Sequence, residues 1–148
     1  MSKLAVNLSM IFTEVPLIER FALAREHGFQ HVEIQFPYEL SIEQIQTQLT
    51  LHQLSLCLIN VPACDLMQGG NGLAGVPGKE IEFHHALELA IRYATALNVP
   101  SVNILAGKQP VDADLLPCLN TLVENLKLAC SMLTQHHNQP VFEMINGT

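Results

Sequence analysis

The chain has 148 residues, of which 49% are hydrophobic and 14% are charged, a composition that excludes a disordered chain and fits one globular domain with a buried core. The 14 acidic and 7 basic residues give a net charge of -7, which argues against a nucleic-acid-binding surface, because such surfaces concentrate Lys and Arg. No apolar run approaches the roughly 20 residues of a membrane span, and the N-terminus is too polar for a signal peptide. We therefore expect a cytoplasmic protein without nucleic-acid or membrane partners.

The first third of the chain alternates between strand-like and helix-like patterns. Leu4 to Leu8 is an apolar run typical of a strand. A helical pattern then begins at Pro16 and ends at Gly28, where a residue with a left-handed backbone is favoured. Residues 31–34 predict a second strand, and apolar residues at helical spacing after Ser41 predict a second helix.

The rest of the chain continues this alternation. We expect strands at residues 54–61, at 101–105 and from Pro140 onward, and helices at 80–97 and 111–135. Connections long enough to hold helices are typical of a parallel sheet with right-handed crossovers. Residues 1–148 are therefore predicted to form a single α/β domain.

Five strands and four helices fit two architectures. One is an open flavodoxin-like sheet with strand order 2-1-3-4-5, which normally ends with a helix after the fifth strand. The other is the first half of a (β/α)8 TIM barrel, which has sequential strand order 1-2-3-4-5 and takes ~250 residues in its full form. The patterns alone do not choose between these two.

Polar residues recur at the C-terminal ends of the predicted strands, the edge where α/β proteins gather ligand groups. They are Asn7, Glu33, Gln35, Asn60, Lys108, Glu143 and Asn146. Each of them taken singly is more often a capping or solvated residue than a functional one. Taken together, they predict a ring of polar groups around one mouth of the sheet.

Other motifs give weaker signals. Residues 70–75 match Gly-x-Gly-x-x-Gly, but Pro77 prevents the immediate helix that would hold a pyrophosphate. The adjacent pairs His84–His85 and His136–His137 are expected to face solvent, because neighbours on a helix point in different directions. The long loop at 63–79 is typical of a lid over a site. The four cysteines lack Cys-x-x-Cys spacing, which favours reduced thiols over disulfides or zinc.

Several segments together resemble the hydroxypyruvate isomerase family, in that family's order and approximate spacing. They are Asn7–Met10, Val32–Tyr38, Asn60–Ala63, Gly72–Gly78, Ala90–Ala94, Asn103–Lys108, Leu122–Leu126 and Glu143–Asn146. The family belongs to the xylose-isomerase-like barrels and includes the similar 2-oxo-tetronate isomerases. The resemblance covers the whole chain and about the first half of the family's barrel, so it implies the TIM-barrel reading.

The resemblance implies an intramolecular oxidoreductase, an isomerase that interconverts hydroxypyruvate and 2-hydroxy-3-oxopropanoate (tartronate semialdehyde) through an enediol. Such chemistry needs a carboxylate acid/base pair and groups that stabilise an oxyanion. By resemblance Glu143 is one member of that pair and a ligand of a divalent metal, Mg²⁺ or Mn²⁺. The substrate-binding residues implied are Asn7, Glu33, Asn60, Lys108 and Asn146.

The sequence departs from the family in two ways. Met144 replaces the family's usual proline after the catalytic glutamate, which keeps the carboxylate. The second glutamate and the remaining metal ligands belong to later strands, so we expect no firm metal binding and weak or no isomerase activity from these 148 residues. The first and fifth strands would be open edges. The alternatives are a non-catalytic half-barrel homodimer or binding module, and an isomerase specific for 2-oxo-tetronate.

Overall fold

The computed structural model of the protein describes residues 4–144, which form a five-stranded parallel sheet in the order β1-β2-β3-β4-β5. The strands are β1 (Ala5–Asn7), β2 (His31–Glu33), β3 (Ser55–Asn60), β4 (Ser101–Leu105) and β5 (Gln139–Glu143). The helices are α1 (Leu17–Glu26), α2 (Ile42–Leu51), α3 (Glu80–Leu97) and α4 (Leu115–Gln135), with short 3-10 turns η1 (Pro37–Glu39) and η2 (Leu66–Gln68). Sequential order confirms the TIM-barrel prediction and excludes the flavodoxin-like order.

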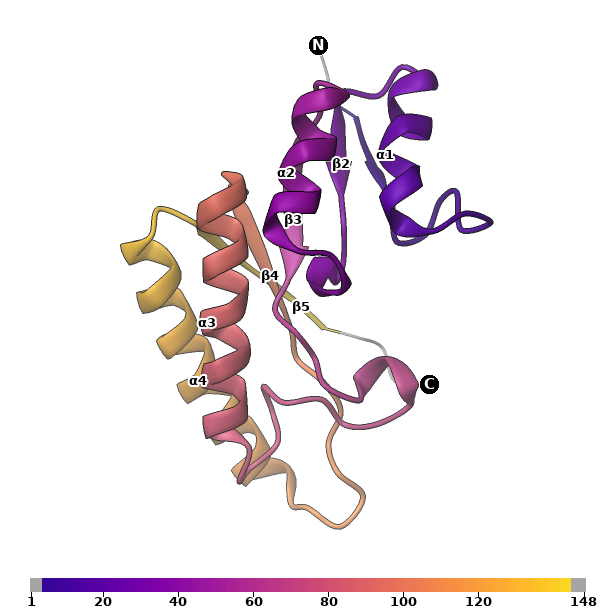
Figure 1. The fold of residues 1–148 in the computed structure, drawn as a ribbon. Coiled ribbons are helices and arrows are strands. Elements are labelled where there is room, and N and C mark those ends of the chain that lie inside the picture. Colours follow the sequence, from indigo (N-terminus) through magenta and orange to yellow (C-terminus); the bar gives the residue numbers. More distant parts are fainter. Residues whose placement is uncertain (1–3, 145–148) are drawn as a thin grey trace.

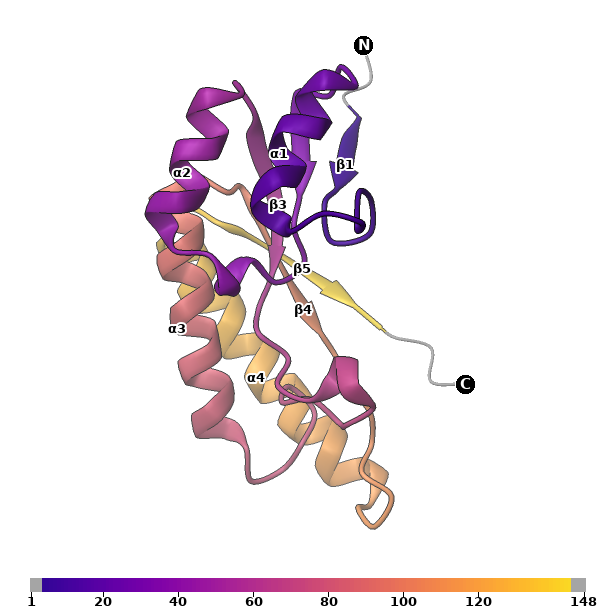
Figure 2. The same cartoon turned by 45° about the vertical axis from the view of Figure 1, so that its right-hand side comes forward.

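The four helices cover one face of the twisted sheet (Figures 1 and 2). Strand residues that point toward the helices are buried: Val6, Val32, Leu56, Ile59, Val102 and Ile104 are 0–7% exposed. The residues that alternate with them point to the opposite, concave face, where Ala5, Ser55 and Val141 are exposed. This division follows from the two-residue period of a strand, and it leaves the inner face of the sheet accessible.

The register of the strands aligns their C-terminal ends. Asn7 pairs with Glu33, Asn60 pairs with Asn103, and Leu105 pairs with Glu143. Between β2 and β3 the register shifts after Val32, which leaves Cys57 as an extra residue in β3. Such a bulge changes the direction of the side chains that follow it. The residues of β3 after Cys57 therefore pair one position later than they would in a regular ladder.

Local sequence signals explain most helix boundaries. Ser41 and Gln44 form a capping box at the start of α2, with hydrogen bonds of 2.9 and 3.1 Å in the two directions. Gly28 follows α1 with φ of +86°, as predicted for a residue that ends a helix. The predicted helix start at residue 111 is wrong, because α4 begins at Leu115. Pro117 then falls in the first turn, where its missing N–H is not required.

The remaining sequence expectations concern residues away from the site. Neither histidine pair is buried, and the His84 ring lies 3.4 Å from the Glu88 carboxylate on α3. The four cysteines form no disulfide among the described residues. Within residues 4–144, no helix has both the length and the apolar character needed to cross a membrane.

Candidate active site

Three side chains from neighbouring strands meet on the concave face near the C-terminal edge of the sheet. The Asn103 amide nitrogen donates to the Asn60 amide oxygen at 3.2 Å and to Oε2 of Glu143 at 2.8 Å. Asn103 lies on β4, between Asn60 on β3 and Glu143 on β5. The structure therefore joins two predicted site residues, Asn60 and Glu143, through a third that we did not predict.

Asn60 and Asn103 are buried, whereas Glu143 is exposed. The Glu143 carboxylate is thus held at one oxygen by a buried amide while its side chain remains open to solvent. A hydrogen bond to an ionised acceptor is shorter and stronger than one between neutral groups, in agreement with the 2.8 Å separation. This arrangement fixes the direction of the carboxylate and leaves it accessible to a small molecule.

Tyr38 supports the cluster from the loop after β2. Its hydroxyl donates to the backbone carbonyl oxygen of Asn60, and its ring packs edge-on against Tyr93 with centroids 5.0 Å apart. Burial raises the pKa of the Tyr38 hydroxyl well above its ordinary value, and the nearby Tyr93 adds to this effect. Tyr38 is therefore a neutral donor that fixes the end of β3.

Asn7 and Glu33 lie opposite each other at the ends of β1 and β2. The Asn7 amide oxygen accepts from the Ser9 backbone N–H at 2.9 Å, and the Ser9 hydroxyl accepts from the Gln35 backbone N–H at 2.8 Å. Part of the hydrogen-bonding capacity of Asn7 is thus used to shape its own loop. Both residues are half-buried and lie at the edge where we expected them.

Lys108 lies in the loop after β4, and its side chain is exposed. Its side chain makes no hydrogen bond or ion pair with the part of the chain that the structure describes, so the structure does not bring that side chain into the Asn60, Asn103 and Glu143 cluster. Its backbone N–H donates to the Asn71 carbonyl oxygen at 3.0 Å. Asn146, the remaining predicted residue, lies outside the described residues.

The loop at 63–79 packs against α4 and against the loop that follows β4. Leu66 and residues 72–76 are buried, and the Asn125 amide on α4 donates to the Ala74 carbonyl oxygen at 2.8 Å. Gly107 has φ of +83°, and a Cβ there would lie 2.4 Å from the Asn71 carbonyl oxygen. Close backbone contact with the β4 loop therefore holds this segment beside the strand ends.

One hollow lies among the loops at the C-terminal ends of the strands, and another lies nearer their N-terminal ends. The first has a volume of about 380 Å³ and is lined mostly by apolar residues of the β2 and β3 loops, among them Phe36, Tyr38, Pro62 and Met67. Tyr38 lines this hollow and donates to the Asn60 backbone carbonyl oxygen, but none of the three cluster residues lines the hollow itself. Its size is in the range of small-molecule sites.

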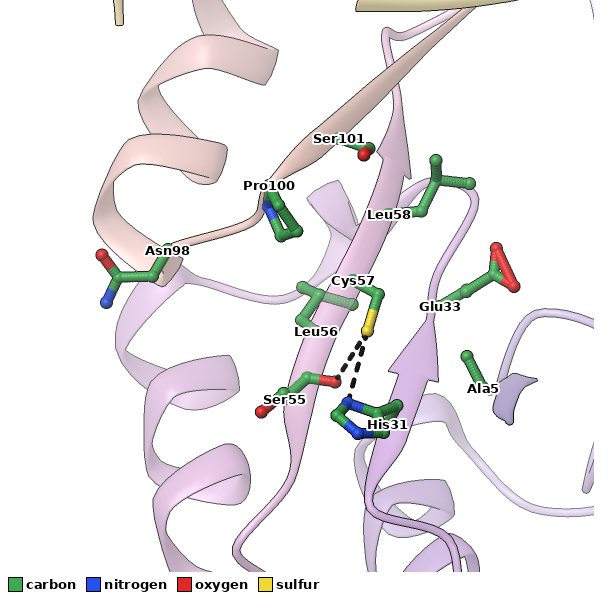
Figure 3. Close-up of a pocket in the computed structure, with 10 residues that line it drawn as sticks. All are labelled: Ala5, His31, Glu33, Ser55, Leu56, Cys57, Leu58, Asn98, Pro100 and Ser101. Carbon is green, nitrogen blue, oxygen red and sulfur yellow. Dashed lines mark hydrogen bonds between the residues drawn. The ribbon is translucent and has the colours of Figure 1, made fainter. Parts of the chain in front are cut away.

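The second hollow, of about 570 Å³, lies on the concave face toward the N-terminal ends of the strands (Figure 3). His31, Glu33 and Cys57 line it, and the Cys57 sulfur lies 3.6 Å from Nδ1 of His31. In barrels of this topology that end serves stability more than chemistry. We therefore place the candidate active site at the opposite end, although this hollow is larger.

Asn103 is the residue that strand-end reasoning missed, because it lies two residues before the end of β4. A signal was present in the sequence. Asn103 is an amide within the apolar strand Ser101–Leu105, and a buried polar side chain in such a strand requires a hydrogen-bonding partner. The two-residue period also places it on the same face as Ser101.

The sequence profile of the family described as "Xylose isomerase-like TIM barrel" matches residues 21–148. The chain belongs to the xylose isomerase-like TIM barrel family. Among curated proteins of this kind, the hydroxypyruvate isomerase of Escherichia coli K12 is 40% identical over 146 residues, which are 99% of this chain and 57% of that protein. The 2-oxo-tetronate isomerase of Haemophilus influenzae is 36% identical over 129 residues, which are 87% of this chain and 50% of that protein. The chain thus spans about half the length of these relatives.

Solved structures support the membership in this barrel family. A crystal structure described as an AP endonuclease of family 2 from Brucella melitensis matches with a TM-score of 0.91 and 36% identity, over 99% of this chain and 56% of that one. A structure of the IolI protein with a bound zinc atom matches with a TM-score of 0.74 at 14% identity, over 97% of this chain and 52% of that one. The second likeness shows the shared fold alone.

The described residues of this xylose isomerase-like chain do not make a metal site by themselves. No group of three or more His, Cys, Asp or Glu side chains within residues 4–144 is placed to hold an ion. The cluster offers one carboxylate, Glu143, and amide groups from Asn60 and Asn103. Mg²⁺ and related ions need several oxygen ligands in near-octahedral geometry, so these residues do not fit a complete metal centre.

Proposed function

We propose that this chain provides the Glu143-bearing half of an aldose/ketose-type isomerase site that acts on hydroxypyruvate. The observation that carries the proposal is the carboxylate of Glu143 at the C-terminal end of β5, oriented by Asn103 and open to solvent. The curated relatives named hydroxypyruvate isomerase support the same reaction. The partner is thus a small hydroxy or oxo acid.

The reaction has a simple proton balance. A base removes one proton from C3 of hydroxypyruvate and the C2 carbonyl oxygen gains one, which gives the enediol. A proton added to C2 and loss of the C3 hydroxyl proton then give the aldehyde group of 2-hydroxy-3-oxopropanoate. In this scheme Glu143 is the carboxylate that exchanges a proton with carbon. Asn103 and Asn60 fix its geometry, and Tyr38 holds the Asn60 backbone. We propose that a complete site also holds a divalent metal, Mg²⁺ or Mn²⁺, to which the described residues would contribute the Glu143 carboxylate.

The other predicted binding residues line the same mouth in this proposal. Asn7 and Glu33 lie at the ends of the first two strands, with Glu33 facing the open concave side (Figure 3). Lys108 follows β4 on an exposed loop, from which its long side chain would reach an anionic substrate. Asn146, which lies outside the described residues, is also proposed as a binding residue.

A four-carbon 2-oxo-tetronate is the second candidate substrate, and the 36% identity to the Haemophilus influenzae 2-oxo-tetronate isomerase favours it. The hollow beside Tyr38, of about 380 Å³, has room for either acid. The two differ by one hydroxyl-bearing carbon. Competition between the two acids for the same chain distinguishes them.

We propose weak or no complete turnover by these 148 residues, since the described residues supply one carboxylate, Glu143, where the proposed chemistry uses an acid/base pair and several metal ligands. A non-catalytic homodimer is the alternative, and the exposed apolar residues of β5 favour it: Val141 is 36% and Phe142 42% exposed.

We propose a cytoplasmic location for either form, supported by the four reduced cysteines. The net charge of -7 supports a partner other than nucleic acid.

An NMR titration of the isotope-labelled chain with hydroxypyruvate tests the substrate class. We expect concentration-dependent shifts centred on Asn60, Asn103 and Glu143, and little change at the far end of the sheet near Ser55. Turnover measured in the same samples, with Mg²⁺ or Mn²⁺ added, should be low. Shifts confined to the N-terminal ends of the strands, or none at all, would overturn the proposed site, and rapid turnover would overturn the weak-activity proposal.

A further inference from the structure

The amide nitrogen of the Asn103 side chain makes hydrogen bonds, whereas its amide oxygen has no partner among the described residues. Its two N–H hydrogens have two acceptors, the Asn60 amide oxygen at 3.2 Å and the Glu143 carboxylate at 2.8 Å. Its oxygen Oδ1 is buried and has no hydrogen-bonding partner among the residues that the structure describes. The residue as a whole is 4% exposed.

The orientation of this amide follows from chemistry. An ionised carboxylate accepts hydrogen bonds and donates none, so the nitrogen of Asn103 must face Glu143. The oxygen then lies on the other side of the same amide, next to the nitrogen that binds the carboxylate. Buried polar atoms in folded proteins nearly always have a partner, and this acceptor belongs to the side chain that binds Glu143, so a molecule bound beside Glu143 would be the donor that it lacks.

We propose that Asn103 is a positioning and specificity residue: its nitrogen orients Glu143, and its oxygen accepts a hydrogen bond from a hydroxyl group of the substrate. This inference rests on the proposed function and extends it to the substrate's recognition. A keto oxygen cannot donate to Asn103, whereas the C3 hydroxyl of hydroxypyruvate can. The site therefore selects acids that carry a hydroxyl on the carbon that loses its proton.

Asn138 offers a matched control. Its amide nitrogen donates to the Val99 carbonyl oxygen at 2.8 Å, and its oxygen is also buried without a partner in the described part of the chain. It precedes β5, however, and so lies at the opposite end of the sheet from Glu143. Equivalent substitutions of Asn103 and Asn138 thus each remove a buried amide, one beside Glu143 and the other at the opposite end of the sheet.

The specificity half is tested with hydroxypyruvate and pyruvate, which differ by one hydroxyl group, in binding titrations followed by NMR. The wild-type chain should prefer hydroxypyruvate. Asn103→Leu should reduce this preference by about tenfold, the usual weight of one hydrogen bond, and Asn138→Leu should leave it unchanged. Should Asn103→Leu fail to fold, Asn103→Ser serves in its place, because its shorter side chain leaves both partners out of reach.

The positioning half is tested without any ligand. Glu143→Gln replaces a charged acceptor by a neutral amide, so the side-chain N–H₂ resonances of Asn103 should shift while those of Asn138 stay in place. Unchanged Asn103 resonances would contradict the hydrogen bond to Glu143. Glu82→Gln, on the exposed surface of α3, is the control for loss of a carboxylate elsewhere.

The outcomes separate this inference from the proposed function. Binding of hydroxypyruvate at the strand ends with the same preference in Asn103→Leu would overturn the specificity role and leave the function standing. An equal loss in Asn138→Leu would overturn it as well, because the effect would then be one of general packing. Failure of the wild-type chain to bind hydroxypyruvate would overturn both the proposed function and the contact between Asn103 and the substrate. The hydrogen bond from Asn103 to Glu143 would still be tested by the shift of the Asn103 resonances in Glu143→Gln.

Discussion

The hydrogen bond from Asn103 to Glu143 runs diagonally across the β4–β5 pair. Asn103 is the register partner of Val141, and Glu143 is the partner of Leu105, so the two side chains are two positions apart on the same face. Their atoms nevertheless meet at 2.8 Å. The parallel register of β4 and β5 thus brings an amide in the middle of one strand to a carboxylate at the end of the next.

Metal binding by the chain should be weak and should depend on Glu143. One carboxylate supplies few of the roughly six oxygen ligands that Mg²⁺ or Mn²⁺ requires, so we expect a Kd above about 1 mM. Paramagnetic broadening of NMR signals by Mn²⁺ should be centred on Glu143 and disappear in Glu143→Gln. Stoichiometric binding at micromolar metal would show that the described residues form a fuller site than their geometry indicates.

Gly107→Ala should destabilise the protein more than Gly78→Ala. Both glycines have positive φ, +83° and +92°, which costs an alanine about 1–2 kcal/mol. At Gly78 a Cβ meets nothing within 4 Å, whereas at Gly107 it would lie 2.4 Å from the Asn71 carbonyl oxygen. We expect an additional cost of about 1–3 kcal/mol for Gly107→Ala, measured by urea unfolding. Equal losses in the two variants would mean that the loop moves aside freely.

Asn125→Ala should loosen the segment at 72–76. The variant removes the 2.8 Å hydrogen bond to the Ala74 carbonyl oxygen and leaves that buried acceptor unsatisfied, at a cost of about 1–3 kcal/mol. Amide hydrogen exchange should accelerate in this segment. Asn120→Ala, at an exposed position on the same helix, is expected to change stability by less than about 0.5 kcal/mol. Unaltered exchange in Asn125→Ala would show that other contacts hold the loop.

Tyr38 should make the protein sensitive to alkali. Burial raises the pKa of its hydroxyl above the ordinary value of 10.0, so the unfolded chain loses this proton at lower pH than the folded chain does. The resulting stability is complete below pH 10 and falls as the pH rises further. Tyr38→Phe removes this ionisation, and its loss of stability between pH 9 and about pH 11 should be smaller than that of wild type. The same alkaline slope in both proteins would assign the effect to other groups.

Helix boundaries were predictable where the amphipathic pattern and a helix-breaking residue indicate the same end point. Helix α3 lies at Glu80–Leu97 as predicted, since its apolar stripe is continuous and Pro100 follows. The start of α4 was not, because the leucine-rich period continues from Val111 although that residue is 99% exposed and contacts no core. The position of Pro117 was the better signal for that boundary.

The site was predictable in part. Strand-end reasoning placed Asn7, Glu33, Asn60 and Glu143 at one edge, because alternation of strands and helices fixes which ends of parallel strands lie together. Which side chains touch depends on register, and the bulge at Cys57 shifts the register of β3 without a sequence pattern that announces it. The role of Asn103 and the exposed position of Lys108 therefore emerged only from the structure.

We propose that Glu143 exchanges a proton with carbon, and solvent-deuterium exchange at C3 of hydroxypyruvate measures this step. Proton removal alone suffices for exchange, so the test does not require complete turnover. In D₂O we expect the wild-type chain to accelerate loss of the C3 proton signal above the rate without protein. Glu143→Gln should return the rate to that background, while Glu82→Gln keeps the wild-type rate. Exchange that is equally fast in wild type and Glu143→Gln, or no faster than background in wild type, would contradict the assignment of Glu143.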